Sequence, residues 1–313
     1  MEPLTDIITL LQPKAILSKL VSGAGKWSVR YERFGHSSFA IVVEGACWLA
    51  IDGQHPTLLR KGDFVFLPTT PNFTLASDLE TKPIVISAET YSEQVLERRH
   101  GDQTSEPNVL LQGGYFTCDP INESLLLKFL PEMIHISSTN AGIESLRQII
   151  GLIEKEIGSE NIGRDLILGR LVEILLLETL RSSGLDKNLQ KVGLLAGLHD
   201  SQIAIALKNI HADVSHKWSL AELGRQAGMS RSSFADRFAK TVGITPIDYL
   251  LQLRMALAKK MLFTEKRSVS EVAFAIGYES ASAFSVAFRR SIGISPGAFA
   301  RGDLFKSMNI NSL

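Results

Sequence analysis

Cysteine is scarce in this chain, which has 313 residues but only Cys47 and Cys118 as thiols. So few cysteines exclude a disulfide framework and a multi-cysteine metal site. A secretory signal is also missing, because residues 1–20 contain no basic segment followed by a long apolar run. The most apolar stretch, Leu166–Leu180, is too short and too charged for a membrane span. We therefore expect a cytoplasmic protein that does not enter a membrane.

Net charge is absent as well, since 33 Lys and Arg balance 33 Asp and Glu. Taken alone, this balance argues against a nucleic-acid partner, which needs concentrated positive charge. The charges are segregated, however. Residues 1–200 hold 18 bases and 25 acids, a net charge of 18 − 25 = −7, and residues 201–313 hold 33 − 18 = 15 bases and 33 − 25 = 8 acids, a net charge of +7. The chain is long enough for two domains, and the opposite signs predict that these domains have different partners.

Short apolar runs separated by turn residues fill the segment from Trp27 to Ile86. The pair Asp52–Gly53 lies between two of these runs, which indicates a hairpin because glycine accepts the positive φ of a tight turn. Strands of this length and spacing predict an antiparallel β-barrel or β-sandwich in the N-terminal part of the chain.

Beyond about residue 122 the apolar period changes from two to about 3.6, which indicates helices. One helix is marked by Ile143, Leu146, Ile149, Ile150 and Ile153, and a second by Leu168, Leu171 and Leu175. The second is apolar on most sides, so we expect it in the core or against another subunit, and both hold if the chain forms a homodimer. Residues 186–197 are expected to form the junction to the basic part.

An internal repeat occupies the basic part. Phe234, Phe238, Gly243 and Pro246 return 50 positions later as Phe284, Phe288, Gly293 and Pro296, whereas Gly228 returns 49 positions later as Gly277. Each copy reads as helix, glycine-containing turn and helix, the signature of a helix-turn-helix motif. We call residues 219–246 the first copy and residues 269–296 the second copy, whose turn is predicted to be one residue longer. Residues 249–263 between them are predicted to form one continuous helix.

The second helix of each copy is expected to enter the major groove of DNA. Ser230 is expected to cap the first of these helices, at an end that favours phosphate contacts. If the paired phenylalanines face inward, a rotation of about 100° per residue turns one set of side chains toward DNA. The candidate DNA-binding residues are Arg231, Ser232, Ser233, Ala235, Asp236 and Lys240 in the first copy and Ala281, Ser282, Ala283, Ser285, Val286, Arg289 and Arg290 in the second. The alternative is that these residues are ordinary solvated surface.

Residues 200–301 resemble the double helix-turn-helix domain of the AraC/XylS transcription regulators, through Gly-Met-Ser-Arg, Gly-Ile-Thr-Pro, Leu-Arg-Met-Ala-Leu-Ala, Gly-Tyr-Glu-Ser and Gly-Ile-Ser-Pro in this order. The resemblance implies sequence-specific binding to double-stranded promoter DNA, usually as an activator that works with RNA polymerase. The family's base contacts map by motif onto Ser232, Ala235, Asp236, Ala281, Ser282, Ser285 and Val286. Arginine is common in the family where Val286 stands, so a contact there would be apolar, for example with a thymine methyl group.

The N-terminal part resembles the cupin barrel that precedes this domain in many such regulators, through residues 45–49 and 58–68, which include Gly-Asp-Phe-Val-Phe-Leu-Pro. The resemblance implies a sensor for an unknown small-molecule effector. Metal-binding cupins carry clustered histidines, whereas His36, His55 and His100 are dispersed here, so no metal and no cofactor are expected.

The effector itself is weakly constrained by the sequence. The candidate ligand-binding residues are Arg30, Arg33, Trp48 and Phe66, with Arg98 and Arg99 as further arginines. Guanidinium groups could hold an anion, and the aromatic rings could line a pocket. The alternatives are surface arginines paired with nearby acids and aromatic rings that only fill the core. Cys47 and Cys118 could sense oxidants if the pKa of a thiol were lowered, although buried cysteines are usually inert.

Three regions follow from these patterns: a cupin-like ligand-sensing domain over residues 1–135, a helical dimerisation or connecting segment over 136–198, and an AraC-type DNA-binding domain over 199–303. We expect a small-molecule or redox signal in the sensor to control DNA binding. The alternative is a cupin-type enzyme fused to a DNA-binding domain. The sequence contains neither His-Glu-x-x-His nor Gly-x-Ser-x-Gly, so we do not expect an enzyme.

Overall fold

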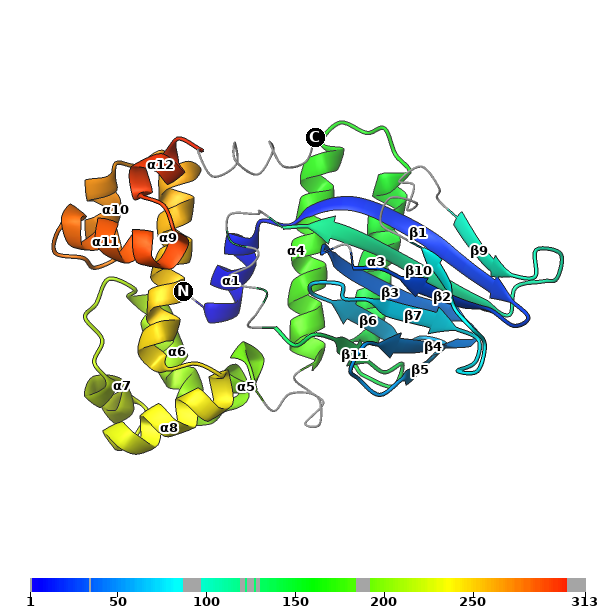
Figure 1. Cartoon of the computed structure of the whole chain (residues 1–313), viewed down its shortest axis with the longest axis horizontal. Helices are drawn as coiled ribbons and strands as arrows, with labels where there is room; N and C mark the ends of the chain where they lie inside the picture. The colour runs from blue at the N-terminus through cyan, green and yellow to red at the C-terminus, as the bar shows by residue number, and fades with distance from the viewer. Residues whose placement is uncertain are drawn as a thin grey trace. The chain divides into compact units, whose positions relative to one another are not determined.

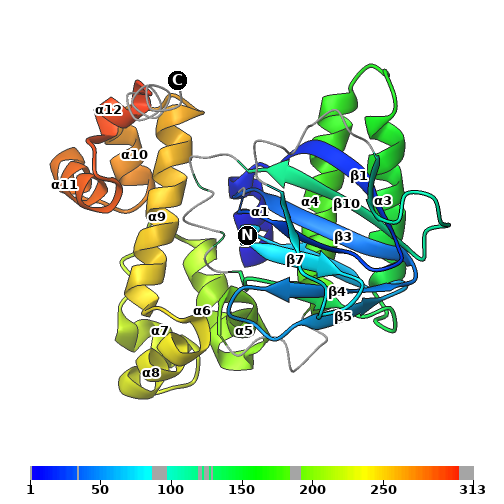
Figure 2. The same ribbon diagram turned by 45° about the vertical axis from the view of Figure 1, so that its right-hand side comes forward.

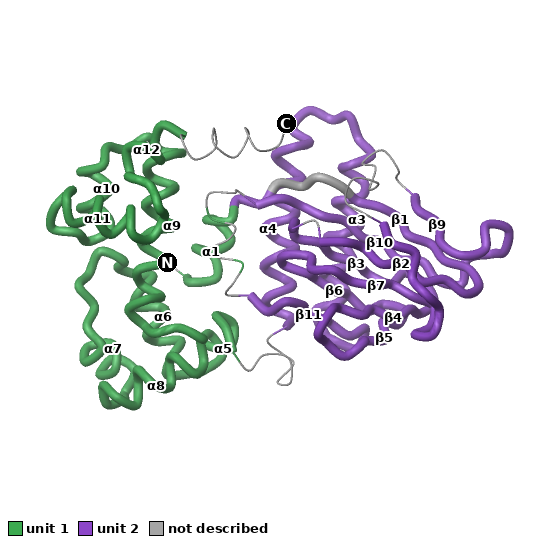
Figure 3. Tube along the Cα trace, in the orientation of Figure 1, with its two compact units in different colours: residues 1–11, 119–129, 191–313 green, residues 12–118, 130–190 purple. Residues whose placement is uncertain are grey.

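The computed structural model describes residues 2–33, 35–86, 97–118, 122, 127, 130–183 and 192–302. The chain divides into two compact units, which Figure 3 shows in different colours. Unit 1 comprises residues 1–11, 119–129 and 191–313, and unit 2 comprises residues 12–118 and 130–190. Each unit has its own hydrophobic cluster.

Unit 2 is built on two β-sheets (Figure 1). Its strands are β1 (Lys14–Ala24), β2 (Ser28–Tyr31), β3 (Ser37–Glu44), β4 (Ala46–Ile51), β5 (Thr57–Arg60), β6 (Phe64–Leu67), β7 (Phe73–Ala76), β8 (Ile84–Ile86), β9 (Glu97–Gly101), β10 (Val109–Thr117) and β11 (Ile134–Ile136). The strand order is β11-β6-β3-β10-β1-β9 in one sheet and β5-β4-β7-β2-β8 in the other. Neighbouring strands are antiparallel except in the parallel pairs β1–β9 and β2–β8. The predicted β fold is thus confirmed as a two-sheet sandwich.

Side chains of the strands alternate between the space enclosed by the two sheets and the outer faces. In β4, Cys47, Leu49 and Ile51 join a core cluster to which both sheets contribute, whereas Trp48 points the other way and is half-buried. The chain leaves β4 through the predicted hairpin and pairs antiparallel with it as β5, with Gly53 at a φ of +80°.

Two helices cover the six-stranded sheet: α3 (Ile143–Ile157) and α4 (Arg164–Ser183) pack against each other and against β1 (Figures 1 and 2). Both helices were predicted, and the five isoleucine and leucine residues that marked α3 are all buried. In the described part of the chain, no helix is both long enough and apolar enough to span a lipid bilayer.

Unit 1 is helical. Its elements after residue 190 are α5 (Leu194–His199), α6 (Ser201–Ala212), α7 (Leu220–Gln226), α8 (Arg231–Val242), α9 (Pro246–Phe263), α10 (Val269–Ala275), α11 (Ala281–Ile292) and α12 (Pro296–Ala300). Helix α9 is the predicted continuous helix and runs from the first copy of the repeat to the second (Figures 1 and 2). It starts earlier than predicted because Thr245 caps it and Pro246 occupies its first turn. Of the junction expected at 186–197, residues 186–191 lie outside the described part, and α5 begins within the remainder.

The helix α1 (Pro3–Leu11) belongs to unit 1, whereas the sequence predicts one sensor domain over residues 1–135. The physical reason is its apolar face: Leu4 and Ile7 are buried, and α1 contacts α6 and α9. The helix is followed after two residues by β1 of unit 2, so the chain passes from unit 1 into unit 2 almost at its start.

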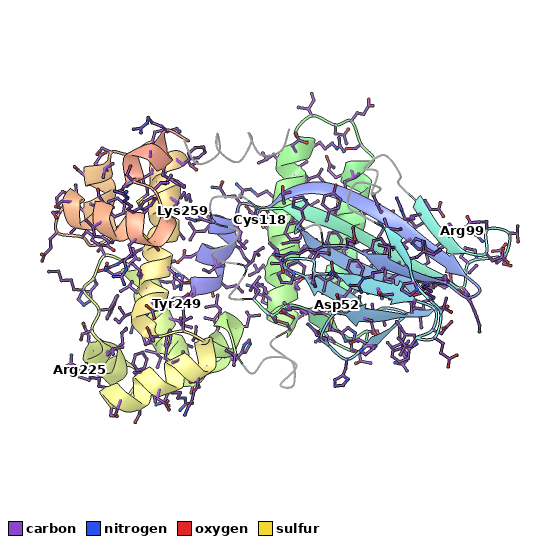
Figure 4. The ribbon with its side chains drawn as sticks, in the orientation of Figure 1. Asp52, Arg99, Cys118, Arg225, Tyr249 and Lys259 are labelled. Carbon is purple, nitrogen blue, oxygen red and sulfur yellow. The ribbon has the colours of Figure 1, made fainter. Side chains whose placement is uncertain are left out.

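A buried chain of hydrogen bonds also holds α1. Asp6 Oδ2 lies 2.8 Å from Nδ1 of His211 on α6, and Nε2 of this ring lies 2.8 Å from the hydroxyl of Tyr249 on α9. Tyr249 is labelled in Figure 4. Burial, together with the charge of Asp6, raises the pKa of Tyr249 far above its usual value. The phenol of Tyr249 therefore stays protonated, and the His211 ring bridges it to the Asp6 side chain.

Candidate nucleic-acid interface and ligand cavity

The first helix-turn-helix copy is formed by α7 and α8. Ser219 caps α7 by accepting a hydrogen bond from the Glu222 N–H, and Ser230 caps α8 by accepting from the Ser233 N–H, as predicted for Ser230. The turn between the helices passes through Gly228, whose φ of +68° suits glycine. These local signals fix where each helix begins, and so they fix the position of every side chain on α8.

The second copy, formed by α10 and α11, repeats this arrangement. Ser268 and Glu271 form a capping box at the start of α10, and Ser280 caps α11. Residues 276–280 separate α10 from α11, whereas residues 227–230 separate α7 from α8. The turn of the second copy is therefore one residue longer, as the change of offset predicted.

The recognition helices α8 and α11 turn their phenylalanines inward and their polar residues outward. Phe234, Phe238, Phe284 and Phe288 are all 0% exposed. The candidate DNA-binding residues Arg231, Ser232, Ser233, Asp236, Lys240, Ser282, Ala283, Val286, Arg289 and Arg290 are exposed, and Ala235, Ala281 and Ser285 are half-buried. The structure therefore brings each predicted set together on one helix face. Base and phosphate contacts by these residues stay predictions.

Two contacts modify the electrostatics of this surface. Asp236 Oδ2 lies 2.9 Å from Nζ of Lys240, one turn further along α8, so the acid of the recognition helix is offset by a base on the same face. Arg237 instead turns away from the recognition face, because its guanidinium binds Asp200 at 2.8 Å and Gln202 at 2.6 Å. Arg237 thus fastens α8 to the start of α6.

One exposed basic side chain near the first recognition helix, that of Arg225, is not among the predicted DNA-binding residues. Arg225 lies on α7, the helix that crosses the DNA backbone in a helix-turn-helix motif (Figure 4). The predicted DNA-binding set is confined to the second helix of each copy, whereas Arg225 lies in the last turn of the first helix, a position that the sequence pattern of the repeat already marks.

Unit 2 contains a small cavity between its two sheets. It has a volume of about 80 Å³ and is lined mainly by apolar side chains, including Val21, Leu49, Leu59, Leu75 and Leu111. Its polar lining comes chiefly from Lys19, Ser38, Tyr31 and Tyr115. The hydroxyl of Tyr31 lies 2.9 Å from Nε2 of buried His100, and burial lowers the pKa of this imidazole to about 4. A neutral imidazole thus contacts the hydroxyl of Tyr31, one of the polar side chains in the lining of a mainly apolar cavity.

None of the four predicted ligand-binding residues lines this cavity. Arg30 faces outward and forms a bidentate pair with Asp52 at 2.9 and 2.6 Å, which raises the pKa of the guanidinium. Arg33 is exposed, Trp48 lies on the outer face of β4, and the ring of Phe66 stacks on a neighbouring phenylalanine at 5.9 Å. Arg98 and Arg99, the two further arginines, lie on β9 and do not line it either.

The two cysteines lie in environments that suit packing. Cys47 is 1% exposed and Cys118 is 4% exposed, and neither forms a disulfide. Burial raises the pKa of the Cys47 thiol to about 12, so the reactive thiolate is scarce at neutral pH. Oxidant sensing by either cysteine stays a prediction, and the raised pKa of Cys47 argues against it.

Within the described ranges, His, Cys, Asp and Glu side chains form no group of three or more that could hold a metal ion. A metal-free sensor stays a prediction.

Comparison with known proteins gives the context of these two units. A family model described as a cupin matches residues 2–183, and one described as a helix-turn-helix domain matches residues 223–302. An AraC-like transcription regulator of Streptomyces lividans is 34% identical over 306 residues, which are 96% of this chain and 98% of that protein. A second AraC-like transcription regulator, from Streptomyces antibioticus, is 34% identical over 308 residues, which are 96% of this chain and 99% of that protein.

Among solved structures, the DNA-binding domain of AdpA, a global transcriptional factor, in complex with a target DNA covers 33% of this chain and 92% of its own length, with 30% identity and a TM-score of 0.31. The two family matches and the full-length relatives agree with the repeat and the sandwich described above. The chain therefore belongs to the AraC-like transcription regulators, with an N-terminal cupin domain and a C-terminal helix-turn-helix domain.

Proposed function

We propose that this regulator binds a promoter site through both α8 and α11 and that a small molecule in the sandwich cavity controls this binding. The observation that carries the proposal is the pair of recognition helices, each with a buried phenylalanine pair and an exposed polar face, joined by one continuous helix. Such a pair fits two successive major-groove segments. We further propose that the chain activates transcription in the cytoplasm with RNA polymerase and is not an enzyme, as its full-length relatives are named regulators.

DNA binding is tested with gel shifts of the intact protein on the DNA upstream of its own gene. We expect the logarithm of the association constant to fall linearly with the logarithm of salt concentration, and the slope to shrink by about two when Arg289 and Arg290 are both replaced by Ala. Arg147→Ala, which removes a surface arginine of unit 2, is the control and should leave the slope unchanged. A protein that binds no duplex even at low salt would refute the proposal.

The cavity is proposed as the effector site because its walls are apolar, which favours a small and largely apolar effector. A route to unit 1 exists along the chain. β1 contributes Lys19 and Val21 to the cavity wall, and it begins two residues after the end of α1, which contacts α6 and α9. A ligand that displaces β1 would thereby act on α1, the helix that packs against α6 and α9 of the DNA-binding unit.

Ala40→Phe is expected to abolish this control, because Ala40 lines the cavity and a phenyl ring would fill it. We would screen small apolar compounds by thermal unfolding and then measure DNA affinity with each compound that binds. Compounds that raise the melting temperature of the wild type and change its DNA affinity should have neither effect on Ala40→Phe. Ala50→Phe is the matched control, since Ala50 lies on the outer face of β4. Equal responses of all three proteins would place the effector elsewhere.

We also propose that α3 and α4 form the contact of a homodimer. Large apolar side chains remain exposed on these two helices and in the turn between them, namely Leu152, Ile162, Leu166, Ile167 and Ile174. A second copy of the chain would remove them from water, which is favourable in proportion to the apolar area buried.

A further inference from the structure

We propose that Arg254 on α9 sets the spacing of the two DNA half-sites by tying the first helix-turn-helix copy to the second. We call residues 213–219, which connect α6 to α7, the entry loop of the first copy. The proposal rests on the DNA binding proposed above and goes beyond it, because it assigns a positioning residue that lies outside both recognition helices.

Arg254 binds the entry loop through its guanidinium group. Nε donates to the carbonyl oxygen of Val214 at 2.9 Å, and Nη2 donates to the carbonyl oxygens of His216 at 2.9 Å and Ser215 at 3.3 Å. The planar, charged fork of arginine can engage several carbonyls at once, which a single ammonium group cannot do in the same geometry. Three successive residues of the loop are thus held by one side chain of the connecting helix.

The entry loop is itself well ordered, so its carbonyls are presented in fixed positions. Asp213 Oδ1 accepts hydrogen bonds from the backbone N–H groups of Ser215 and His216, each at 3.0 Å. The indole N–H of Trp218 donates to the Asp213 carbonyl at 2.8 Å. Because the loop leads straight into α7, the position of the loop fixes where the first copy begins.

The second copy also contacts the guanidinium group of Arg254. The Arg254 guanidinium lies 5.9 Å from the ring centre of Tyr278, in the turn between α10 and α11. The neighbouring residue, Gly277, is so close to the entry loop that a Cβ there would lie 2.0 Å from the Ser215 carbonyl oxygen. The turn of the second copy therefore packs directly on the loop of the first, with Arg254 at the contact.

Partial burial makes this contact different from a surface ion pair. Burial lowers the pKa of the half-buried Arg254 guanidinium, and its hydrogen bond to the Val214 carbonyl is partly buried. Lys217 and Glu279 also pair between the same two copies, but their side chains are 71% and 78% exposed. Ion pairs this exposed contribute little to stability. Arg254 is therefore the polar side chain that we expect to hold the two copies in one relative orientation.

A fixed orientation has a direct consequence for DNA binding. Two rigidly joined recognition helices bind together only when their half-sites are correctly spaced, and the gain from joining them can reach about 10²–10⁴-fold. If the contact between the two copies is loosened, the affinity gained from joining them falls, and the spacing required between the half-sites becomes less strict. Binding of one copy to one half-site does not depend on the contact between the two copies.

The test uses the intact protein and a binding site selected from random duplexes by the wild type. Dissociation constants are measured for this site, for versions with one, two or three base pairs inserted between the half-sites, and for duplexes that keep a single half-site. The wild type should lose about tenfold or more on insertion. Arg254→Lys keeps the charge but not the fork, and should lose about tenfold on the selected site, keep its half-site affinity within about twofold and respond weakly to insertion.

Lys217→Ala is the control, because it removes the exposed pair between the same copies and should keep the wild-type dependence on spacing. Tyr278→Leu is a second variant that leaves the guanidinium contacts with the loop intact, and it should also weaken the dependence. Arg254→Lys with wild-type spacing dependence, or with equal losses on half-sites and full sites, would overturn the proposal in favour of a purely structural role. Failure of the wild type to select any site would instead refute DNA binding itself.

Discussion

Phe284→Ala is expected to lower the free energy of unfolding of unit 1 by about 3–5 kcal/mol, because it removes a fully buried ring from a packed cluster. The ring centre of Phe284 lies 5.5 Å from that of Phe288 and 5.6 Å from that of Tyr278. Neighbouring helices cannot close the resulting cavity without disturbing α10 or α11, since the interior is densely packed. Urea unfolding of the intact protein, followed by fluorescence, measures the loss, and binding to a promoter site should be lost with it.

Val286→Ala is the matched control on the same helix. Val286 lies two residues further along α11 and is 71% exposed, so its truncation should change the unfolding free energy by no more than about 0.5 kcal/mol. Its predicted effect is on recognition: the preference for one base pair of the site should weaken, because an apolar contact in the groove is lost. A loss of stability similar to that of Phe284→Ala would contradict the assignment of this face to DNA.

The helix-turn-helix copies could be predicted from the sequence because their signals are local. The period of about 3.6, the serine caps and the turn glycines each act within a few residues, so a single sequence places every helix face. Both phenylalanine pairs were placed inward by this reasoning and are completely buried. The repeat supplied a second occurrence of the same pattern, which supported the prediction of a helix-turn-helix motif in each copy.

The cavity residues could not be placed in the same way, because a strand such as β6 buries both of its faces. All four residues of β6 are buried, so alternation reveals two faces but not which one meets the cavity. Phe66 was chosen as a ligand contact, whereas its neighbours Val65 and Leu67 line the cavity. On β4, likewise, Trp48 was predicted to contact the ligand, whereas its neighbour Leu49 lines the cavity.

Contacts between residues far apart in the chain have no local sequence pattern that would predict them. Asp6 and His211 are 205 residues apart, and the sequence shows only an acid near the start and a histidine at the end of a helix. Arg254 likewise appears in the sequence as one more base on an amphipathic helix. Only its three carbonyl partners distinguish it from an arginine available to phosphate.

Gly277→Ala is expected to destabilise unit 1 far more than Gly228→Ala, although the two glycines occupy equivalent turns of the repeat. Both have a left-handed backbone, with φ of +86° and +68°, so alanine costs about 1–2 kcal/mol at either position. At Gly277 the added Cβ would also lie 2.0 Å from the Ser215 carbonyl oxygen and 2.8 Å from Nη2 of Arg254. The backbone must move to relieve this clash, which adds about 1–3 kcal/mol.

At Gly228 the nearest atom to an added Cβ is the side-chain nitrogen of Gln202 at 4.0 Å, an ordinary contact. Urea unfolding of the two variants therefore separates backbone strain, which both share, from the close approach of the entry loop, which only Gly277 has. Equal losses would show that the second copy does not press on the entry loop and would weaken the role assigned to Arg254. A larger loss at Gly277 would mean that one glycine of the repeat serves its own turn alone, while the other also joins the two copies.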